Sequence, residues 1–434
     1  MSDVSVSQEI QITQQRIVRV LAAAQVLGGI GVASGAAVGA LLAADLATES
    51  LSGVASASSV IGAALIAIPV SRVMNVHGRR LGLLLAYAIG IVGAIMIVTG
   101  AMVGSFPLAL LGLVATGGGT TAGLQSRYAA TDLATPDKRG RSLSTVVWAT
   151  TVGSVLGPNL ASPMGNLAES FGIPRLAGPY MLTILVFVVS AGMIAVMLKP
   201  DPLLAARVHL ARQSGRGPIG PSAHSSLREV MARITSIPPA FLGLIAMAVG
   251  HAAMVAVMSM TPVHLQHGDA SLRIIGLVIS GHITGMYIAS PLVGMASDRF
   301  GRRPVIVGGS AILLISFLIS GTATGHESTQ LAIGLFLLGL GWSCTLIAGS
   351  TLLTESVPMD ERPNVQGTAD LMMGIAGATA GLLSGVVVGL GSYAMLNVIT
   401  TLLVVPLIVL TLKDGARSPV GVDGVDLEAR RQKA

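Results

Sequence analysis

Long apolar runs recur along the whole chain, and short breaks rich in Arg, Gly or Pro separate them. A helix needs roughly 20 mostly apolar residues to cross a bilayer, and runs of that size are frequent here. The pattern predicts twelve membrane-spanning helices, which begin near residues 17, 51, 81, 106, 142, 176, 238, 271, 304, 329, 364 and 391. We therefore expect an all-α membrane protein with a lipid bilayer as its surroundings.

A polar segment rich in Arg, Ser, Gly and Pro lies between the sixth and seventh predicted helices. This composition is typical of a solvated connection between domains. It divides the chain into an N-terminal six-helix bundle at residues 1–199, a cytoplasmic linker at residues 200–236 and a C-terminal six-helix bundle at residues 237–434. We expect the linker to be a tether with room for one amphipathic helix.

The composition and the charge distribution agree with this assignment. The chain is 52% hydrophobic and 11% charged, with a mean hydropathy of +0.78, whereas soluble domains carry about 25% charged residues. If both termini and the linker are cytoplasmic, only Arg175 and Arg273 of the 26 Lys and Arg residues lie on the outer side. Because Lys and Arg collect in cytoplasmic loops, this topology explains the net charge of +6 without nucleic acid as a partner.

The two halves share an internal repeat. Residues 71–80 read SRVMNVHGRR and residues 294–303 read GMASDRFGRR, so that a shift of 223 positions aligns their Gly-Arg-Arg ends. The same shift aligns residues 131–139, TDLATPDKR, with residues 354–362, TESVPMDER. Two loops that align at one offset indicate homologous halves. Parallel repeats of this kind are typical of transporters whose site lies between the halves near the middle of the bilayer.

The second of these loops resembles the signature loop of the major facilitator superfamily, G-x-x-x-D-R-x-G-R-R. The matching residues are Gly294, Asp298, Arg299, Gly301, Arg302 and Arg303. A carboxylate beside guanidinium groups forms charge-assisted hydrogen bonds, so we expect a conformational latch with Glu355 as a partner. Anchoring of the arginines at the lipid surface is the alternative. Ser71 and Asn75 replace the first Gly and the Asp in the first-half copy, where we expect a weaker latch.

The resemblance covers essentially the whole chain. It implies the major facilitator fold, in which twelve helices form two six-helix pseudo-repeats. It further implies a secondary transporter of the bacterial inner (cytoplasmic) membrane, with both termini cytoplasmic. The expected partner is a small transported solute or metal ion, and the expected oligomeric state is a monomer.

Small residues recur at multiples of four positions in the fifth and eleventh predicted helices, as in Gly153 and Gly157. Such spacing lets helices approach closely. Gly157 and Pro158 also resemble part of the antiporter motif of drug exporters, but Ala161 and Ser162 stand where its double glycine is expected. We interpret these glycines as structural.

Sulfur and imidazole side chains follow one face of the seventh predicted helix. Residues at i, i+4, i+7 and i+11 share a helix face, and these positions hold Met247, His251, Met254 and Met258. The eighth predicted helix carries His282 and Met286 at i and i+4. Because the two helices are antiparallel, Met254 is expected level with His282, about 15 Å below the outer boundary at 1.5 Å per residue.

This set of side chains has the chemistry of a soft-metal site. Thioether and imidazole ligands without carboxylates select Cu(I), whereas zinc prefers His with thiolate or carboxylate. The candidate ligands are Met254, Met258, His282 and Met286, with His251 as a further one, and Cu(I) is expected as a substrate, with no permanently bound cofactor. The alternative is packing, because Met is a flexible gap-filler. Buried His, in contrast, is costly in a membrane and usually faces a polar cavity.

Met254-x-x-x-Met258 and His282-x-x-x-Met286 resemble the paired motifs of CcoA-like copper importers, a branch of the same superfamily. The resemblance implies uptake of copper. Relatives in this branch carry riboflavin instead, so an organic-solute transporter for riboflavin uptake or drug/proton antiport remains the alternative. Copper-dependent growth and labelled riboflavin uptake distinguish the two.

No nucleotide-binding loop of the G-x-x-x-x-G-K-[ST] type and no catalytic triad candidate occurs in the sequence. We therefore expect no enzyme activity and expect transport to be driven by gradients. Asp370, about two turns into the eleventh predicted helix, is the best candidate for a buried acid that couples transport to protons. Arg127 and Asp132, near the inner end of the fourth predicted helix, are further candidates for proton or substrate groups, and a position at the membrane interface is the alternative for both.

Overall fold

The computed structural model describes residues 3–47, 52–214, 220 and 226–417. Residues 215–219 and 221–225 of the expected linker, and both ends of the chain, lie outside the described residues. The first half contains α1 (Asp3–Leu46), α2 (Ser52–His77), α3 (Arg79–Val103), α4 (Phe106–Ala129), α5 (Arg139–Ser170) and α6 (Gly178–Met197). The linker contains α7 (Pro202–Ser214) and α8 (Leu227–Ser236). The second half contains α9 (Pro238–His267), α10 (Leu272–Tyr287), α11 (Ser290–Phe300), α12 (Arg302–Thr322), α13 (Ser328–Glu355), α14 (Arg362–Leu390) and α15 (Tyr393–Arg417).

The twelve predicted helices are all present, and all but the first begin within three residues of the predicted position. The first begins earlier, because α1 continues through the polar segment that precedes residue 17. The eighth predicted helix consists of α10 and α11, and Pro291 lies in the first turn of α11. A proline is tolerated in the first turn of a helix but breaks a continuous one, which is consistent with the interruption at this point.

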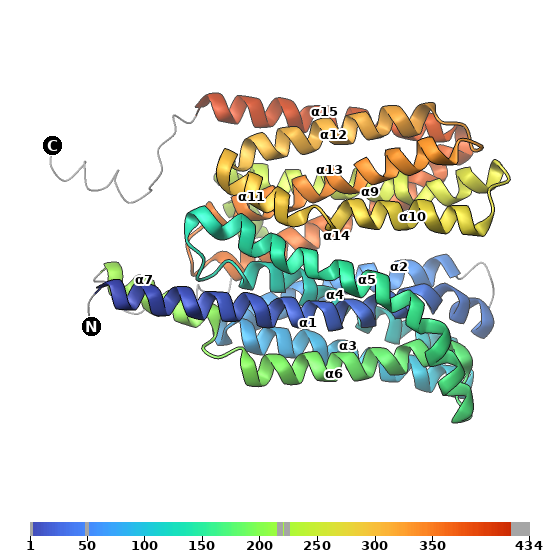
Figure 1. Cartoon of the computed structure of the whole chain (residues 1–434), viewed down its shortest axis with the longest axis horizontal. Helices are drawn as coiled ribbons and strands as arrows, with labels where there is room; N and C mark the ends of the chain where they lie inside the picture. The colour runs from blue at the N-terminus through green and yellow to red at the C-terminus, as the bar shows by residue number, and fades with distance from the viewer. Residues whose placement is uncertain (1–2, 48–51, 215–219, 221–225, 418–434) are drawn as a thin grey trace.

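Eleven segments of the described chain are long and apolar enough to cross a membrane, and α5 is not among them. Its sequence is rich in Gly, Ser, Thr and Pro. In Figure 1 the helix nevertheless runs alongside α1 over most of its length, in the position of the twelfth crossing. Helices α1 and α11 cover the part of α5 nearest its start, whereas polar residues farther along it, such as Asn159 and Asn166, are exposed.

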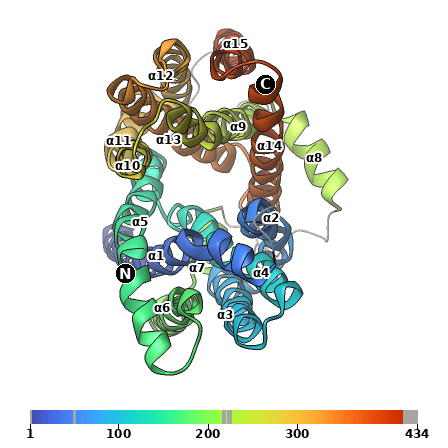
Figure 2. The same cartoon turned by 90° about the vertical axis from the view of Figure 1, so that its right-hand side faces the viewer.

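The helices form two bundles, with the start of α1 and the end of α15 at the same end of the molecule, which we call the terminal end (Figure 1). Seen along the helix axes, α1–α6 form one bundle and α9–α15 the other (Figure 2). The bundles contact each other through α2 with α14 and through α5 with α11. These contacts involve Ser71 with Gly367 and Ser144 with Gly294, which lie toward the terminal end of their helices. The halves are therefore closed against each other at the terminal end.

The backbone conformation explains why both copies of the repeated loop contain a glycine before the two arginines. Gly78 links α2 to α3 with a φ of 88°, and Gly301 links α11 to α12 with a φ of 92°. Residues with a side chain disfavour this region of φ, whereas glycine adopts it readily. The glycine that precedes the two arginines in each loop is therefore required by the same turn in both halves.

Candidate functional site

The loop between α11 and α12 places charged residues in a cluster at the terminal end. Arg302 donates from Nε and Nη2 to the two carboxylate oxygens of Glu355, at 3.1 and 2.7 Å, and its Nη1 lies 3.0 Å from Asp298 Oδ1. Asp298 accepts hydrogen bonds from the backbone N–H groups of Gly140 and Arg141, at 2.9 and 2.8 Å. These two N–H groups lie in the first turn of α5, so a carboxylate of the second half caps a helix of the first half.

Further contacts of this cluster cross between the halves. Arg302 Nη2 donates to the carbonyl oxygen of Pro136 at 2.8 Å, and Arg139 Nη1 lies 3.6 Å from Glu355 Oε1. Gly294 leaves room for the Ser144 hydroxyl of α5, since a Cβ atom there would collide with it. Arg299 is exposed and its guanidinium lies over the Phe300 ring at 5.3 Å, and Arg303 is half-buried. Arg302 therefore contacts Glu355 of its own half and Pro136 of the opposite half.

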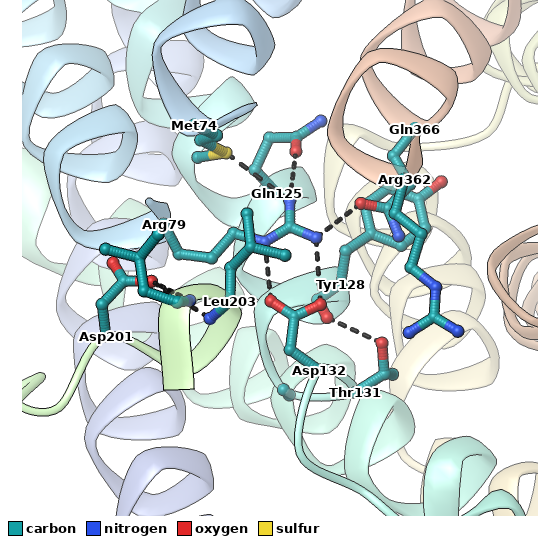
Figure 3. Close-up of polar contacts among 12 residues, drawn as sticks. Met74, Arg79, Gln125, Tyr128, Thr131, Asp132, Asp201, Leu203, Arg362 and Gln366 are labelled. Atoms are coloured by element: carbon teal, nitrogen blue, oxygen red, sulfur yellow. Dashed lines mark hydrogen bonds and ion pairs between the residues drawn. The ribbon is translucent and has the colours of Figure 1, made fainter. Parts of the chain in front are cut away.

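The first-half copy contains a second buried ion pair (Figure 3). Arg79 donates from Nε and Nη2 to the two oxygens of Asp132, at 2.8 and 3.2 Å, and both side chains are fully buried. Arg79 Nη2 also donates to Gln366 Oε1 of α14 at 2.6 Å, which connects the two halves. The weaker first-half latch stays a prediction, but the structure gives this copy an ion pair and a cross-half contact of its own. The replacement of Asp by Asn75 leaves the Arg79–Asp132 pair, which corresponds to Arg302–Glu355, intact.

The linker contributes directly to this end of the molecule. Arg207 of α7 is buried and donates to the backbone oxygen and to Oδ1 of Asn75, at 2.8 Å each, and its Nη2 lies 3.5 Å from the Asp360 oxygen. Asp201, which precedes α7, accepts from the Arg80 N–H at 2.7 Å (Figure 3). The expected amphipathic helix of the linker is present as α8, which packs on α9 and α14. The linker is nevertheless more than a solvated tether, because the buried Arg207 contacts Asn75 of the first half and Asp360 of the second.

A further ion pair between the halves lies one turn beyond Gln366 along α14. Arg127 Nη2 of α4 lies 2.6 Å from Asp370 Oδ1, and Gln125 Nε2 donates to Asp370 Oδ2 at 2.9 Å. The Tyr128 hydroxyl lies 3.5 Å from the same carboxylate. All four side chains are buried. Asp370 is therefore a buried acid, as its position in the sequence predicted, but Arg127 and Asp132 are buried in ion pairs rather than exposed at the interface.

A cavity of about 180 Å³ lies between the halves and is bordered by α1, α4, α5, α10 and α13. The first half contributes Gln25, Thr150 and Arg127 to its wall, and Gln25 Nε2 donates to the Thr150 hydroxyl at 2.9 Å. The second half contributes Tyr287 and Trp342, whose ring centroids are 5.9 Å apart at an interplanar angle of 89°. An aromatic corner from one half thus faces amide, hydroxyl and guanidinium groups from the other.

The predicted metal ligands lie around α13 rather than on the wall of this cavity. His251 Nδ1 accepts from Trp342 Nε1 at 3.1 Å, and the other side of the His251 ring lies against Gly377 of α14. His282 Nδ1 lies 2.8 Å from the carbonyl oxygen of Leu335. The two helices that carry the ligands both pack against α13 and contact each other little. The spacing predicted which of these side chains lie on α9 and which on α10. It did not show that α13 lies between these two helices.

The remaining predicted ligands are Met254, 5% exposed, Met286, 9% exposed, and the partly buried Met258. All three belong to the large apolar core of the second half. Within the described residues, no cluster of three or more His, Cys, Asp or Glu side chains is arranged to hold a metal ion. A role of these methionines and histidines as Cu(I) ligands stays a prediction.

The glycines of α5 have the structural role that their spacing predicted. A Cβ atom on Gly153 would lie 2.6 Å from the backbone of Gly29, and one on Gly157 would lie 2.8 Å from the Ile30 oxygen. The backbones of α1 and α5 are therefore in direct contact, as expected for small residues at this spacing.

Sequence analysis missed five residues that the structure places at the centre of the molecule or in its charge clusters. A signal existed for Trp342, because the chain has 2 Trp and only 3% aromatic residues, so that a Trp within an apolar run is unusual. Gln125 and Gln366 were detectable as amides within apolar helices. Tyr287 and Arg207 carried no local signal, since nothing in the sequence shows which side chain reaches which helix.

Comparison with known proteins agrees with this architecture. The sequence profile described as Major Facilitator Superfamily matches residues 20–271 and 264–429. The chain is 37% identical to the uncharacterized MFS-type transporter YdeG of Bacillus subtilis over 399 residues, which is 91% of either chain. It is 26% identical to the riboflavin transporter RfnT of Brucella anthropi over 416 residues, 93% of this chain and 97% of the relative.

Among solved structures, the proton:xylose symporter XylE is similar in fold. The two structures superpose with a TM-score of 0.71 over 93% of this chain and 96% of XylE, at 16% sequence identity. The profile match extends over nearly the whole sequence, and the paired bundles have the arrangement of solved members. The chain therefore belongs to the Major Facilitator Superfamily, and it is a multi-pass secondary transporter rather than an enzyme.

Proposed function

We propose that this transporter carries a small planar organic solute across the cytoplasmic membrane of a bacterium, and that riboflavin is the first solute to test. The observation that carries the proposal is the composition of the central cavity. Trp342 and Tyr287 offer ring faces and edges for a flat aromatic solute, while Gln25 and Arg127 offer hydrogen bonds to its polar edge. Similarity to RfnT over nearly the whole chain supports the same class of solute.

Binding of such a solute requires a wider cavity than the one described. The volume of about 180 Å³ is below the roughly 300–1,000 Å³ typical of sites for organic ligands. The excess of Lys and Arg at the terminal end supports a cytoplasmic location for that end. On this orientation the Arg302–Glu355 and Arg79–Asp132 clusters keep the cytoplasmic side closed, and the solute enters from the outer side. Release into the cytoplasm then requires both clusters to separate from the opposite half.

Asp370 is the residue that we propose to link this opening to a proton. When the terminal end opens, α4 and α14 move apart and Asp370 loses Arg127, which lies 2.6 Å away in the closed state. A buried charge without its partner is strongly unfavourable. Uptake of a proton by the carboxylate removes that cost, so the open state and the protonated acid favour each other.

The test is riboflavin accumulation by membrane vesicles that contain the protein under an imposed proton gradient. The informative variant is Trp342→Ala, which removes one wall of the aromatic corner, and the matched control is Trp148→Ala, since Trp148 is 41% exposed on α5. Loss of a stacked ring costs about 1.4 kcal/mol beyond the buried area, which corresponds to about a tenfold lower affinity. Vesicles that accumulate no riboflavin above background, or equal uptake by both variants, contradict the flavin assignment.

Cu(I) remains a second candidate substrate, and His282 is the observation that favours it. The Leu335 carbonyl can only accept a hydrogen bond, so His282 Nδ1 carries the proton and Nε2 has the free lone pair. Nε2 is buried and has no partner among the described residues. A backbone carbonyl that accepts from the other ring nitrogen and so fixes the tautomer is common for metal-bound histidine.

The measurement is the copper content of the purified protein under reducing conditions. The variant His282→Ala/Met286→Ala removes the two candidate ligands of α10, and Met197→Ala, at an exposed position of α6, is the control. Copper bound by the wild type and the control but not by the double variant supports the site. An equal copper content in all three proteins refutes it.

A further inference from the structure

A groove of about 590 Å³ lies at the terminal end between α1 and the start of α5. It is separate from the central cavity, because its walls come from residues 10–19 of α1 and residues 133–145. Both walls belong to the first half. No residue of the second half belongs to its walls, although the backbone of residues 136–141 is bonded to Asp298 and Arg302.

The walls of this groove carry positive charge from two elements. Arg19 lies on α1, and Lys138 and Arg141 lie at the start of α5. All three are exposed, and no Asp or Glu belongs to the walls. Asp137, next to Lys138, forms a hydrogen bond with the Thr135 side chain, which lowers the pKa of the Asp137 carboxyl. Three cations that line one groove without a carboxylate in its walls provide a site for an anion.

The groove has a fixed floor. Gln14 is 9% exposed although it lies on a wall of the groove. Its Nε2 donates to the Ala130 carbonyl at 2.6 Å and lies 3.4 Å from the Ser142 hydroxyl. These bonds hold α1 to the segment that leads into α5. The relative position of the two walls is therefore defined without a ligand.

The position of the groove along α1 identifies its environment. Twenty-seven residues separate Arg19 from Leu46 at the far end of the helix, which corresponds to about 40 Å at 1.5 Å per residue. A bilayer with its headgroups is about 40–45 Å thick. If Leu46 lies near one surface, Arg19 lies at the headgroup level of the other. Apolar Val18 and Leu133 complete the walls, and a lipid can cover them with the first carbons of its acyl chains.

We propose that this groove binds the headgroup of an anionic phospholipid. The phosphate lies among Arg19, Lys138 and Arg141, and the exposed amides of Gln11 and Gln15 bind the polar end of the headgroup. Phosphatidylglycerol has the required chemistry, since it combines one negative phosphate with two hydroxyl groups. Basic pockets between membrane helices are known to recognise anionic headgroups.

The experiment measures the melting temperature of the full-length protein in neutral detergent with added phosphatidylglycerol, phosphatidylcholine or glycerol 3-phosphate. The variant Arg19→Gln/Lys138→Gln removes two charges from the groove. The control Arg16→Gln/Arg72→Gln removes two exposed charges at the same end that lie outside it. We expect phosphatidylglycerol to raise the melting temperature of the wild type and the control equally, and the groove variant to lose more than half of that shift. Phosphatidylcholine and glycerol 3-phosphate are expected to give no shift.

Three results overturn the proposal. One is an equal shift for both double variants, and another is a shift with phosphatidylcholine as large as that with phosphatidylglycerol. The third is a full shift with glycerol 3-phosphate, which identifies a site for soluble anions. If the groove variant does not fold, Gln15→Trp blocks the groove without a change of charge. Native mass spectrometry then compares lipid retention between this variant and the wild type, and equal retention of phosphatidylglycerol also refutes the site.

Discussion

The ion pair between Arg127 and Asp370 provides the sharpest prediction, because it is buried and joins the two halves. Arg127→Gln keeps much of the side-chain volume but leaves Asp370 with only Gln125 and Tyr128 as partners. Removal of one partner of a buried ion pair costs about 3–5 kcal/mol. The cost falls on the state in which α4 and α14 are in contact. Since about 1.4 kcal/mol corresponds to a factor of ten, the closed terminal end is expected to lose a factor of about 100–4,000 relative to the open one.

A single engineered cysteine reports this change. Cys344 is buried and is the only cysteine, so Cys344→Ser gives a background without thiols. Ser71→Cys is nearly isosteric, and the Ser71 hydroxyl packs against Gly367 across the interface with 1% exposure. A maleimide therefore reaches this thiol when the terminal end opens. The rate of labelling measures the open population, and Arg127→Gln is expected to raise it by at least 100-fold or to the fully open limit.

Two controls test whether the unpaired charge of Asp370 causes the faster labelling. Arg127→Gln/Asp370→Asn contains no unpaired charge, so it is expected to label much more slowly than Arg127→Gln. Arg233 and Glu361 are 2.9 Å apart but have side chains 46% and 29% exposed, and exposed pairs contribute at most about 1 kcal/mol. Arg233→Gln should therefore change the rate less than about fivefold. The reasoning is refuted if Arg127→Gln labels like the wild type, or if the double variant labels as fast as Arg127→Gln.

Three further predictions use matched positions. Arg207→Ala removes the hydrogen bonds from α7 to Asn75 and to Asp360 of the second half. It is expected to raise the same labelling rate by about 10- to 150-fold, since a hydrogen bond to a charged group contributes about 1.5–3 kcal/mol. Arg212→Ala, at an exposed position on α7, should leave the rate unchanged, and equal rates for the two variants would disprove the role of the linker. Asp298→Asn removes the charge that caps α5 and should also increase labelling, whereas an unaltered rate would assign the closed state to the first-half cluster alone. Gly153→Val places a side chain against the backbone of Gly29 and should lower the yield of folded protein in size-exclusion chromatography, while Gly192→Val on α6, where a Cβ atom has no neighbour within 4 Å, should not.

Much of the fold was predictable because membrane-spanning helices follow hydropathy. Predicted starts such as 106 for α4 and 238 for α9 agree with the structure, because turn residues and charges mark where a helix leaves the bilayer. The interruption between α10 and α11 was not predicted, since Pro291 lies within an otherwise apolar segment. The early start of α1 was missed because residues 3–16 are helical but polar, and hydropathy detects only the part within the lipid.

The candidate site was less predictable, because its geometry depends on which helix faces which. Periodicity placed His251 and His282 correctly on their own helices, yet it contained no information on α13. This helix donates a hydrogen bond to His251 and accepts one from His282. Arg302 and Glu355 were recognisable from the motif because the pairing of opposite charges at helix ends is local chemistry. The Arg127–Asp370 pair joins residues 243 positions apart. Its two members were each visible as unusual residues, but only the packing of α4 against α14 makes them partners.

The composition of α5 has a consequence for the biogenesis of the transporter. A segment with this many small and polar residues does not partition into lipid on its own hydropathy. Its integration during synthesis therefore depends on α1, whose Gly29 surface receives the glycine face of α5, and the insertion machinery must retain the earlier helices until this one emerges. Chains that lack α1 are accordingly expected to leave α5 outside the bilayer and to invert the topology of every segment that follows.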